Sequence, residues 1–312
     1  MLIYQLVFGI DSGQVSCAFH DDTRASAGVN VQGTGGYNCF ACGAKASSEV
    51  GFIAKYFGVG MDRAVKIKDN LDKIQTRGYI KGPVTDEQRQ FLLSIGIDDA
   101  LITQYFFASA TGKLIYDHKW NGISVGYTWF NNPKLSNYSA SADKYKYDGS
   151  NIGGSLTPYD DVVRYKHLIL CEGEKDMLTA KSKGFKNAVA KIGGAKSYVL
   201  PGVNFNNKKV VIIYDCDEFG RVGAEQDADL LTERCACQVK VVDLGLQDGE
   251  DLNDYFIKYG KSHQDLMDLI AATPIHVPKP KSTKSKLQKF VDALSPTEYT
   301  ELEEILKERK GD

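Results

Sequence analysis

The sequence has neither a long apolar run, which would place it in a membrane, nor a net positive charge, which would give it a general affinity for nucleic acid. It has no run of about 18 apolar residues, the length that spans a bilayer, and residues 1–10 carry neither the basic start nor the cleavage site of a signal peptide. Its formal net charge is −2, so nucleic acid would have to be bound by local Lys and Arg side chains. We therefore expect a cytosolic protein with no membrane partner.

Cysteine usage and hydrophobic content exclude two further classes of protein. The seven cysteines are an odd number, and Cys39 and Cys42 have metal-ligand spacing, which favours a reducing compartment over a disulfide framework. A hydrophobic content of 43% over 312 residues excludes a disordered chain. That length is enough for one large core or for two to three smaller ones.

A phosphate loop is also absent from the sequence. Gly260, Lys261 and Ser262 match the end of the motif, but position 255 is tyrosine where the first glycine should be. We therefore expect no helicase motor in this chain.

Carboxylates follow two apolar runs near the middle of the chain. Glu172 follows the run 168–171, and Asp215 and Asp217 follow the run 210–214. Both runs are typical of buried parallel strands, whose carboxyl ends meet at the ligand-binding edge of an open sheet. Asp215 and Asp217 would have Cα atoms about 6–7 Å apart in an extended chain and would repel each other without a cation. The pattern predicts one or two Mg²⁺ or Mn²⁺ ions at this edge.

The order of the remaining elements predicts several parts. Residues 1–60 indicate a small β-ribbon, and residues 61–165 a mixed α+β part with helices at 86–95 and 98–107. Strands and helices alternate from 166 to 275, which predicts a parallel sheet with helical crossovers. The expected strands are 168–171, 188–192, 210–214 and 239–244, and the expected helices are 176–183 and 222–234. Residues 276–312 form a basic linker and a helical tail.

Two pairs of metal-binding residues lie in the first part. Cys17 and His20 form one pair and Cys39 and Cys42 the other, each with two residues between its members. Such pairs can close a tetrahedral site around one structural Zn²⁺, which would supply about 10 kcal/mol of folding free energy. The alternative is three buried cysteines and an exposed histidine.

The text around these ligands resembles a known family. Cys-Ala-Phe-His at 17–20, Cys-Phe-Ala-Cys-Gly at 39–43 and the following residues 49–65 are similar to the zinc ribbon of bacterial and phage DNA primases. That resemblance implies a ribbon that reads single-stranded template. A zinc ribbon that serves some other partner is the alternative.

The acidic segments also resemble known motifs. Residues 171–180 and 214–224 are similar to the two signature motifs of the Toprim domain, in the form found in phage primase-helicases. The resemblance implies Glu172 as the catalytic glutamate, with Asp215 and Asp217 as metal ligands. It implies Asp176 and Asp251 as supporting acids. Glu174 is counted with them, and its alternative is a surface carboxylate in the first turn of the following helix. Asp254 is either another acid of this site or a helix-start residue.

The resemblance implies an α/β fold with an amino-terminal zinc ribbon, an α+β middle subdomain, a Toprim-type parallel sheet with helices on both faces, and a carboxyl-terminal helical tail. The corresponding domains are 1–60 (zinc-binding ribbon), 61–165 (first subdomain of an RNA polymerase domain), 166–275 (Toprim) and 276–312 (linker and tail). Basic residues around the acids are candidates for contacts with the nucleotide or the template, and their alternative is a solvated surface role: Lys144, Lys146, Arg164, Lys175, Lys191 and Arg221.

The aromatic residues of the middle part have two possible roles. Their rings either pack in a small sheet, which the alternation favours, or stack on bases: Tyr116, Trp120, Tyr127, Trp129, Phe130 and Tyr138.

The tail has the pattern of short helices. Its apolar residues recur at helical spacing, and Ser295, Pro296 and Glu298 have the pattern of a helix start. The tail is expected to dock on a replicative helicase or, alternatively, on the body of the protein.

The function expected from this resemblance is primer synthesis in the cytoplasm of a bacterium or a phage-infected cell. The partners would be single-stranded DNA and ribonucleoside triphosphates, and the reaction would be nucleotidyl transfer with divalent metal. The alternatives are a Toprim-containing recombination or repair mediator, which binds DNA, and a Toprim nuclease.

Overall fold

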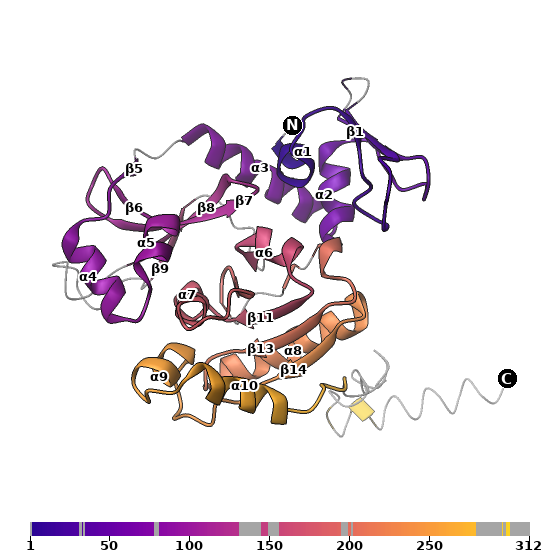
Figure 1. Cartoon of the computed structure of the whole chain (residues 1–312). Helices are drawn as coiled ribbons and strands as arrows, with labels where there is room; N and C mark the ends of the chain where they lie inside the picture. Colours follow the sequence, from indigo (N-terminus) through magenta and orange to yellow (C-terminus); the bar gives the residue numbers. More distant parts are fainter. Residues whose placement is uncertain are drawn as a thin grey trace. The chain divides into compact units, whose positions relative to one another are not determined.

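The structure is a computed structural model that describes residues 2–30, 33, 35–77, 81–130, 145–148, 156–194, 199–200, 202–278, 295 and 298–299 (Figure 1). The chain forms two units, Met1–Val277 and Pro278–Asp312. Among the described helices, none has both the length and the apolar content that a membrane span requires.

A four-stranded antiparallel sheet and three helices build the amino-terminal part. The strands lie in chain order: β1 (Gly13–Val15), β2 (Ala27–Val29), β3 (Tyr37–Cys39) and β4 (Lys45–Ala46). The helices are α1 (Leu2–Phe8), α2 (Glu49–Phe57) and α3 (Met61–Arg77). Phe52 of α2 packs against Tyr4 and Tyr37 with ring centroids 5.1 Å apart in both pairs, so the helices supply the core that the small sheet lacks. The sequence patterns did not predict α1.

The middle part is a second antiparallel sheet with two helices. Its strands also lie in chain order: β5 (Lys81–Gly82), β6 (Phe106–Ser109), β7 (Leu114–Trp120), β8 (Ile123–Phe130) and β9 (Tyr145–Asp148). Helix α4 (Asp86–Ser94) matches its expected range, whereas α5 (Asp99–Tyr105) is shorter because Phe106 and Phe107 enter β6.

Most rings of the middle part pack in the core, as alternation along the strands predicts. The buried rings are Tyr116, Trp120, Tyr127 and Phe130. Trp129 is half-buried, and Tyr138 lies outside the described residues.

The third part is a five-stranded sheet in the order β10-β12-β11-β13-β14. Its strands are β10 (Leu156–Thr157), β11 (His167–Cys171), β12 (Ala188–Lys191), β13 (Lys209–Ile213) and β14 (Gln238–Val241). Four of them are parallel, as expected, but β10 joins the edge beside β12 in the antiparallel direction. The sheet is therefore mixed.

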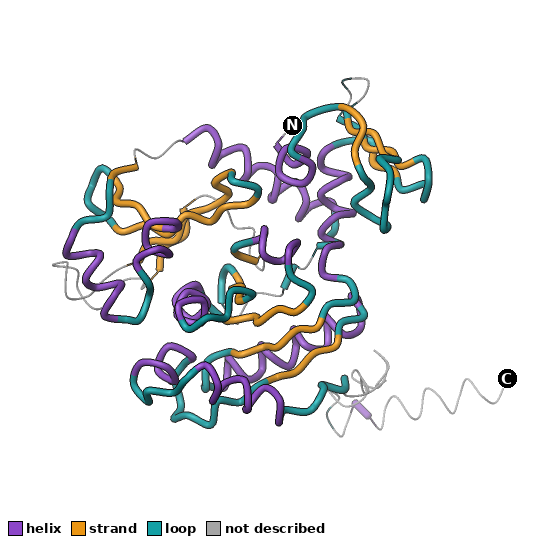
Figure 2. Tube along the Cα trace, viewed as in Figure 1, coloured by secondary structure: helices purple, strands orange, loops and turns teal. Residues whose placement is uncertain are grey.

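Helices cover both faces of this sheet (Figure 2). They are α6 (Tyr159–Arg164), α7 (Glu174–Ser182), α8 (Glu218–Cys235), α9 (Leu252–Ile257) and α10 (His263–Ala272), with a short 3₁₀ turn at Val203–Phe205. Side chains alternate along β11: Leu170 faces the core that includes Leu231 of α8, whereas Ile169 faces the core that includes Met177 of α7. A sheet buried on both faces can present polar side chains only at its strand ends.

Aromatic contacts join the three parts. The Tyr56 hydroxyl of α2 lies 3.0 Å from the Tyr159 hydroxyl of α6 and accepts a hydrogen bond from Asn204 at 2.6 Å. Trp120 of β7 packs against both tyrosines, with its ring centroid 4.5 Å from that of Tyr159 and 6.0 Å from that of Tyr56. The amino-terminal part therefore packs through α2 on both of the other parts.

The unit Pro278–Asp312 shows the predicted helix start at three described residues. The Ser295 hydroxyl donates to Glu298 at 2.6 Å, the Glu298 amide donates back to the Ser295 hydroxyl, and the Tyr299 amide donates to the Ser295 carbonyl. The predicted capping pair is thus confirmed. The other tail residues named from the sequence lie outside the described residues.

Candidate metal centres

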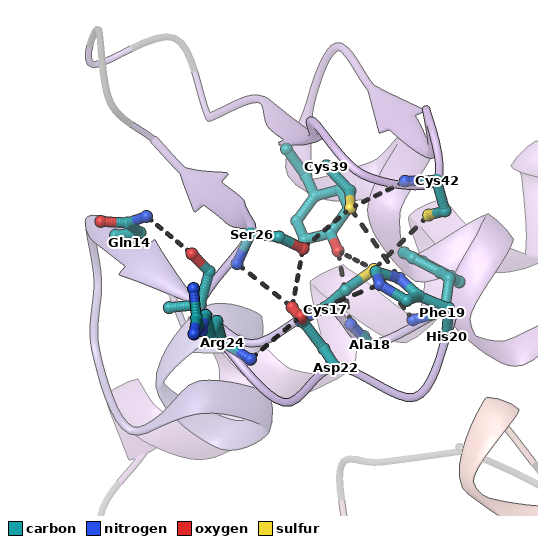
Figure 3. Close-up of polar contacts among 12 residues, drawn as sticks. Gln14, Cys17, Ala18, Phe19, His20, Asp22, Arg24, Ser26, Cys39 and Cys42 are labelled. Atoms are coloured by element: carbon teal, nitrogen blue, oxygen red, sulfur yellow. Dashed lines mark hydrogen bonds and ion pairs between the residues drawn. The ribbon is translucent and has the colours of Figure 1, made fainter.

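The four predicted zinc ligands converge in the amino-terminal sheet (Figure 3). One ligand atom from each of Cys17, His20, Cys39 and Cys42 lies within 4.8 Å of every other. The Cys17 and Cys42 sulfurs are 3.7 Å apart, and two sulfurs bound tetrahedrally to one Zn²⁺ at about 2.3 Å would be about 3.8 Å apart. The donor set and its spacing therefore fit a zinc ion.

Two of these sulfurs accept hydrogen bonds from the surrounding protein. The Tyr37 hydroxyl donates to the Cys17 sulfur at 2.9 Å, and the Cys42 amide donates to the Cys39 sulfur at 3.4 Å. Burial raises the pKa of the Cys39 thiol, but the Cys42 amide and the Ser26 hydroxyl outweigh it and bring the pKa to about 6. The thiolate, which is the zinc-binding form, is thereby favoured.

Asp22 is a supporting residue that the sequence patterns missed. Its Oδ2 accepts hydrogen bonds from the Cys17 amide at 2.8 Å, the Ser26 amide at 3.1 Å and the Ser26 hydroxyl at 2.7 Å (Figure 3). These bonds fix the turn that carries Cys17 beside the start of β2. An Asp followed four positions later by Ser was the only local signal.

The acidic group forms at the carboxyl ends of β11 and β13. These strands pair in parallel with Cys171 opposite Ile213, so Glu172 lies beside the residues that follow β13. The Asp215 amide donates to Glu172 Oε2 at 3.3 Å. The predicted convergence of Glu172 with the second acidic segment is thus present.

Asp217 caps helix α8 and fixes its approach to the strand end. Its Oδ1 accepts a hydrogen bond from the Gly220 amide at 2.6 Å. A Cβ atom at position 220 would lie 2.2 Å from the Asp215 carbonyl oxygen, so only glycine fits this turn. The spacing Asp-x-Asp-x-x-Gly therefore has a steric reason.

Asp176 and Asp251 approach the same edge from α7 and α9. Asp251 forms an ion pair with Lys175 at 2.5 Å, and Asp176 accepts a hydrogen bond from the Asn253 amide at 3.1 Å. Asp254 exchanges capping hydrogen bonds with Asp251, which favours its helix-start interpretation.

The electrostatics of the group indicate a surplus of negative charge. Burial, followed by the charges of Glu172 and Asp251, raises the pKa of Asp215 to about 7, against the opposing charge of Lys175. In Asp176, burial and then the charge of Asp251 raise the pKa well above its usual range. A divalent cation would relieve this repulsion.

The acidic group is more open than the zinc site. Among the described residues, the Cys–His group is the one set of three or more His, Cys, Asp or Glu side chains whose ligand atoms already lie close enough together to hold a metal ion. Mg²⁺ suits the looser arrangement, because it usually takes one or two carboxylates and completes its shell with water and substrate phosphates. The residues at this edge therefore fit Mg²⁺ or Mn²⁺ held together with a substrate.

Glu174 is buried, which corrects the surface alternative. It accepts a hydrogen bond from the Thr128 hydroxyl of β8 at 3.0 Å. That hydroxyl in turn lies 2.6 Å from His118 Nε2, and burial lowers the His118 pKa to about 3, so the imidazole is neutral. These contacts join α7 to the middle sheet.

The predicted basic residues occupy varied environments. Lys175 pairs with Asp251, Arg221 donates to the Cys216 carbonyl at 3.0 Å, and Arg164 is exposed at the end of α6. Lys144 lies outside the described residues, and the side chain of Lys146 in β9 is not among those described.

The prediction that Lys191 contacts the nucleotide does not fit its burial. Its side chain is fully buried and pairs with Asp227 at 2.5 Å. The apolar run of β12 gave no sign that its last residue has a partner on α8.

Comparison with known proteins supports the resemblance. A family model described as Toprim-like matches residues 169–256. The DNA primase of Campylobacter jejuni is 31% identical over 132 residues, which are 41% of this chain and 22% of that protein. The DNA primase of Aquifex aeolicus is 30% identical over 114 residues, which are 36% of this chain and 22% of that protein. The chain thus contains a Toprim-like domain and its similarity to DNA primases is confirmed, but the matches span about a fifth of each relative's length.

Solved structures give a weaker likeness. The zinc-binding and RNA polymerase domains of the Aquifex aeolicus primase match 85% of this chain and 80% of their own, with a TM-score of 0.48 and 20% identity. The primase fragment of the bacteriophage T7 primase-helicase matches 82% of this chain and 98% of its own, with a TM-score of 0.42 and 17% identity.

Replacing a zinc ligand tests the metal centre. We expect Cys39→Ser to lose bound zinc and to melt at a lower temperature, because the ribbon depends on the metal for its folding free energy. Elemental analysis of the purified protein measures the zinc. Phe40→Ala is the matched control, since this side chain is 81% exposed in the same turn. Equal zinc content in Cys39→Ser and the unsubstituted protein would contradict the assignment.

Glu174 should make stability depend on pH. Burial raises its pKa from 4.5 to about 7 in the folded protein. The folded state therefore favours the protonated form, so the contribution of Glu174 is full below about pH 4.5 and is lost as the pH rises through 7. For a buried carboxyl the loss is about 3 kcal/mol. Glu174→Gln should remove this part of the loss in urea unfolding measured between pH 4.5 and 8.

Glu218→Gln is the control for that measurement, because Glu218 is exposed at the start of α8. Its stability profile should follow that of the unsubstituted protein. The same pH dependence in Glu174→Gln would show that Glu174 titrates alike in the folded and unfolded chains.

Proposed function

We propose that the chain is a DNA primase that synthesises short RNA primers on single-stranded DNA by metal-dependent nucleotidyl transfer. The observation that carries the proposal is the combination, in one chain, of a Toprim-like acidic edge and a Cys₃His ribbon. The similarity to DNA primases supports it. Either feature alone is compatible with other nucleic-acid enzymes.

The chemistry requires a nucleotide hydroxyl and a triphosphate to meet in line. The 3′-hydroxyl of one nucleotide gives its proton to water as its oxygen forms a bond to the α-phosphorus of the next nucleotide. The bond from that phosphorus to the oxygen that bridges to the β-phosphate breaks, and pyrophosphate leaves with the electron pair. When bound, Mg²⁺ or Mn²⁺ stabilises the charge on the attacking and leaving oxygens. Glu172, Asp215 and Asp217 would hold the ion at the edge of the sheet.

The neighbouring residues would position the reactants. Asp176 and Asp251 would support the site electrostatically. Lys175, which pairs with Asp251, would bind the triphosphate. Arg164 and Arg221 are further candidates for template or nucleotide contacts. The ribbon, folded around one zinc ion, would read the template.

One reaction separates this function from its alternatives. The protein is incubated with single-stranded DNA, labelled ribonucleotides and Mg²⁺, and the products are separated by size. New oligoribonucleotides support primase. Shortened DNA identifies a nuclease, and bound but unchanged DNA identifies a mediator; either result contradicts the proposal.

Glu172→Gln tests the catalytic assignment. The substitution keeps the shape of the side chain but removes the charge that a metal needs, so primer synthesis should fall by about 100-fold or more. Zinc content and thermal stability should stay the same. Glu218→Gln, a neutralised acid on the same edge helix, should keep full synthesis. Full activity in Glu172→Gln would move the catalytic role to another residue.

The tail is the proposed contact for a replicative helicase. Deleting residues 278–312 should leave primer synthesis within about twofold but abolish its stimulation by the helicase, because the tail's apolar residues would dock on the partner. Leu302→Ser with Leu306→Ser should have the same effect, whereas Glu303→Gln in the same segment should not. Stimulation that survives the deletion would contradict this role.

A further inference from the structure

One buried carboxylate joins the segments that surround the acidic edge. Asp227 of α8 is 1% exposed. Its Oδ2 accepts hydrogen bonds from Lys191 Nζ at 2.5 Å and from the Tyr214 hydroxyl at 2.7 Å, and its Oδ1 accepts one from the Val199 amide at 2.9 Å. Asp227 therefore contacts the end of β12, the end of β13 and the chain at 199 at the same time.

Two partners of Asp227, and the helix that carries it, are connected to proposed metal ligands. Tyr214 directly precedes Asp215, and α8, which carries Asp227, begins at its cap Asp217. Lys191 ends β12, whose Ala190 pairs with Cys171 of β11, the residue before Glu172. A shift of any of these segments would move one of the three carboxylates.

Lys191 also adds charge close to the acids. Its ammonium lies 4.7 Å from the centroid of the Tyr214 ring. Burial lowers the pKa of Lys191, and the charges of Asp227 and Glu172 oppose that shift. Lys191 is therefore a cation held away from solvent and within the electrostatic reach of Glu172.

Stability alone does not account for this arrangement. A buried ion pair has a desolvation cost that often equals or exceeds its Coulombic gain, and an apolar pair of similar volume is commonly as stable. The pair does, however, specify geometry, because one carboxylate with three donors fixes the directions of all of them. We therefore interpret the Lys191–Asp227 contact as one that fixes the position of the strand ends and adds little to the free energy of unfolding.

We propose that Lys191, Asp227 and Tyr214 are positioning residues, which hold the ends of β12 and β13 and helix α8 so that Glu172, Asp215 and Asp217 face one divalent ion. The inference rests on the proposed function only for the role of that ion. In this proposal Lys191 holds the buried segments behind the acidic edge in place and does not contact the nucleotide.

Mn²⁺ binding measured by electron paramagnetic resonance tests the inference without requiring polymerase activity. The double variant Lys191→Met with Asp227→Leu replaces the ion pair by apolar side chains and leaves no buried charge unpaired, although the Tyr214 hydroxyl and the Val199 amide lose their acceptor. We expect it to fold and to melt at a lower temperature than the unsubstituted protein, and to bind Mn²⁺ about tenfold more weakly, the effect seen when supports of metal ligands are removed. In primer synthesis, the Mg²⁺ concentration for half-maximal rate should rise more than the maximal rate falls.

Two further variants make the result decisive. Tyr214→Phe keeps the ring and removes one hydrogen bond, so it should weaken Mn²⁺ binding even if the double variant does not fold. Lys208→Met is the matched control: Lys208 is also a buried lysine, but it donates to the Tyr165 carbonyl next to the start of β13, far along the strand from the acids. It should bind Mn²⁺ as the unsubstituted protein does.

Unchanged Mn²⁺ affinity in folded Tyr214→Phe and in the double variant would overturn the positioning role. The failure of the proposed function looks different. A protein that makes no primers, yet binds Mn²⁺ less tightly in these variants than in Lys208→Met, would retain the positioning role and lose the primase assignment.

Discussion

The parallel pairing of β11 and β13 is the constraint on which the rest of the structure depends. With Cys171 opposite Ile213, the two strands end at the same level, and both are buried on their two faces. Polar side chains can then emerge only past the strand ends. Glu172 and Asp215 are forced together there, and their partial burial holds the pKa of Asp215 near 7. The repulsion between these carboxylates, which a divalent ion would relieve, is thus a consequence of sheet packing.

Helices α7 and α8 fix the positions of these carboxylates. Helix α7, which follows Glu172, is anchored to the middle sheet through Glu174 and Thr128. Helix α8 is anchored to the ends of β12 and β13 through Asp227. Gly220 lets α8 start directly against the Asp215 carbonyl. The acidic edge therefore sits on rigid elements with buried polar contacts on two sides, which favours a preorganised site over a loop that closes on its substrate.

Local spacing predicted which Cys and His side chains converge and which carboxylates lie at the strand ends, because both signals lie within a few residues: a two-residue gap within each pair and a carboxylate after an apolar run. Long-range partners left no such signal. Thr128 lies 46 positions before Glu174 and Asp227 lies 36 positions after Lys191, so neither contact could be predicted. The expected contact of Lys191 with the nucleotide does not fit the burial of its side chain. The antiparallel edge strand β10 and helix α1 were missed because each is short.

Diffraction from crystals soaked in Mn²⁺, with data collected at its absorption edge, locates the divalent ion. We expect an anomalous peak at the carboxyl ends of β11 and β13, about 2 Å from carboxylate oxygens of Glu172 and of Asp215 or Asp217. The peak should be absent from crystals of Glu172→Gln. No peak at this edge, or an equal peak in the variant, would contradict the claim that these carboxylates form a metal site.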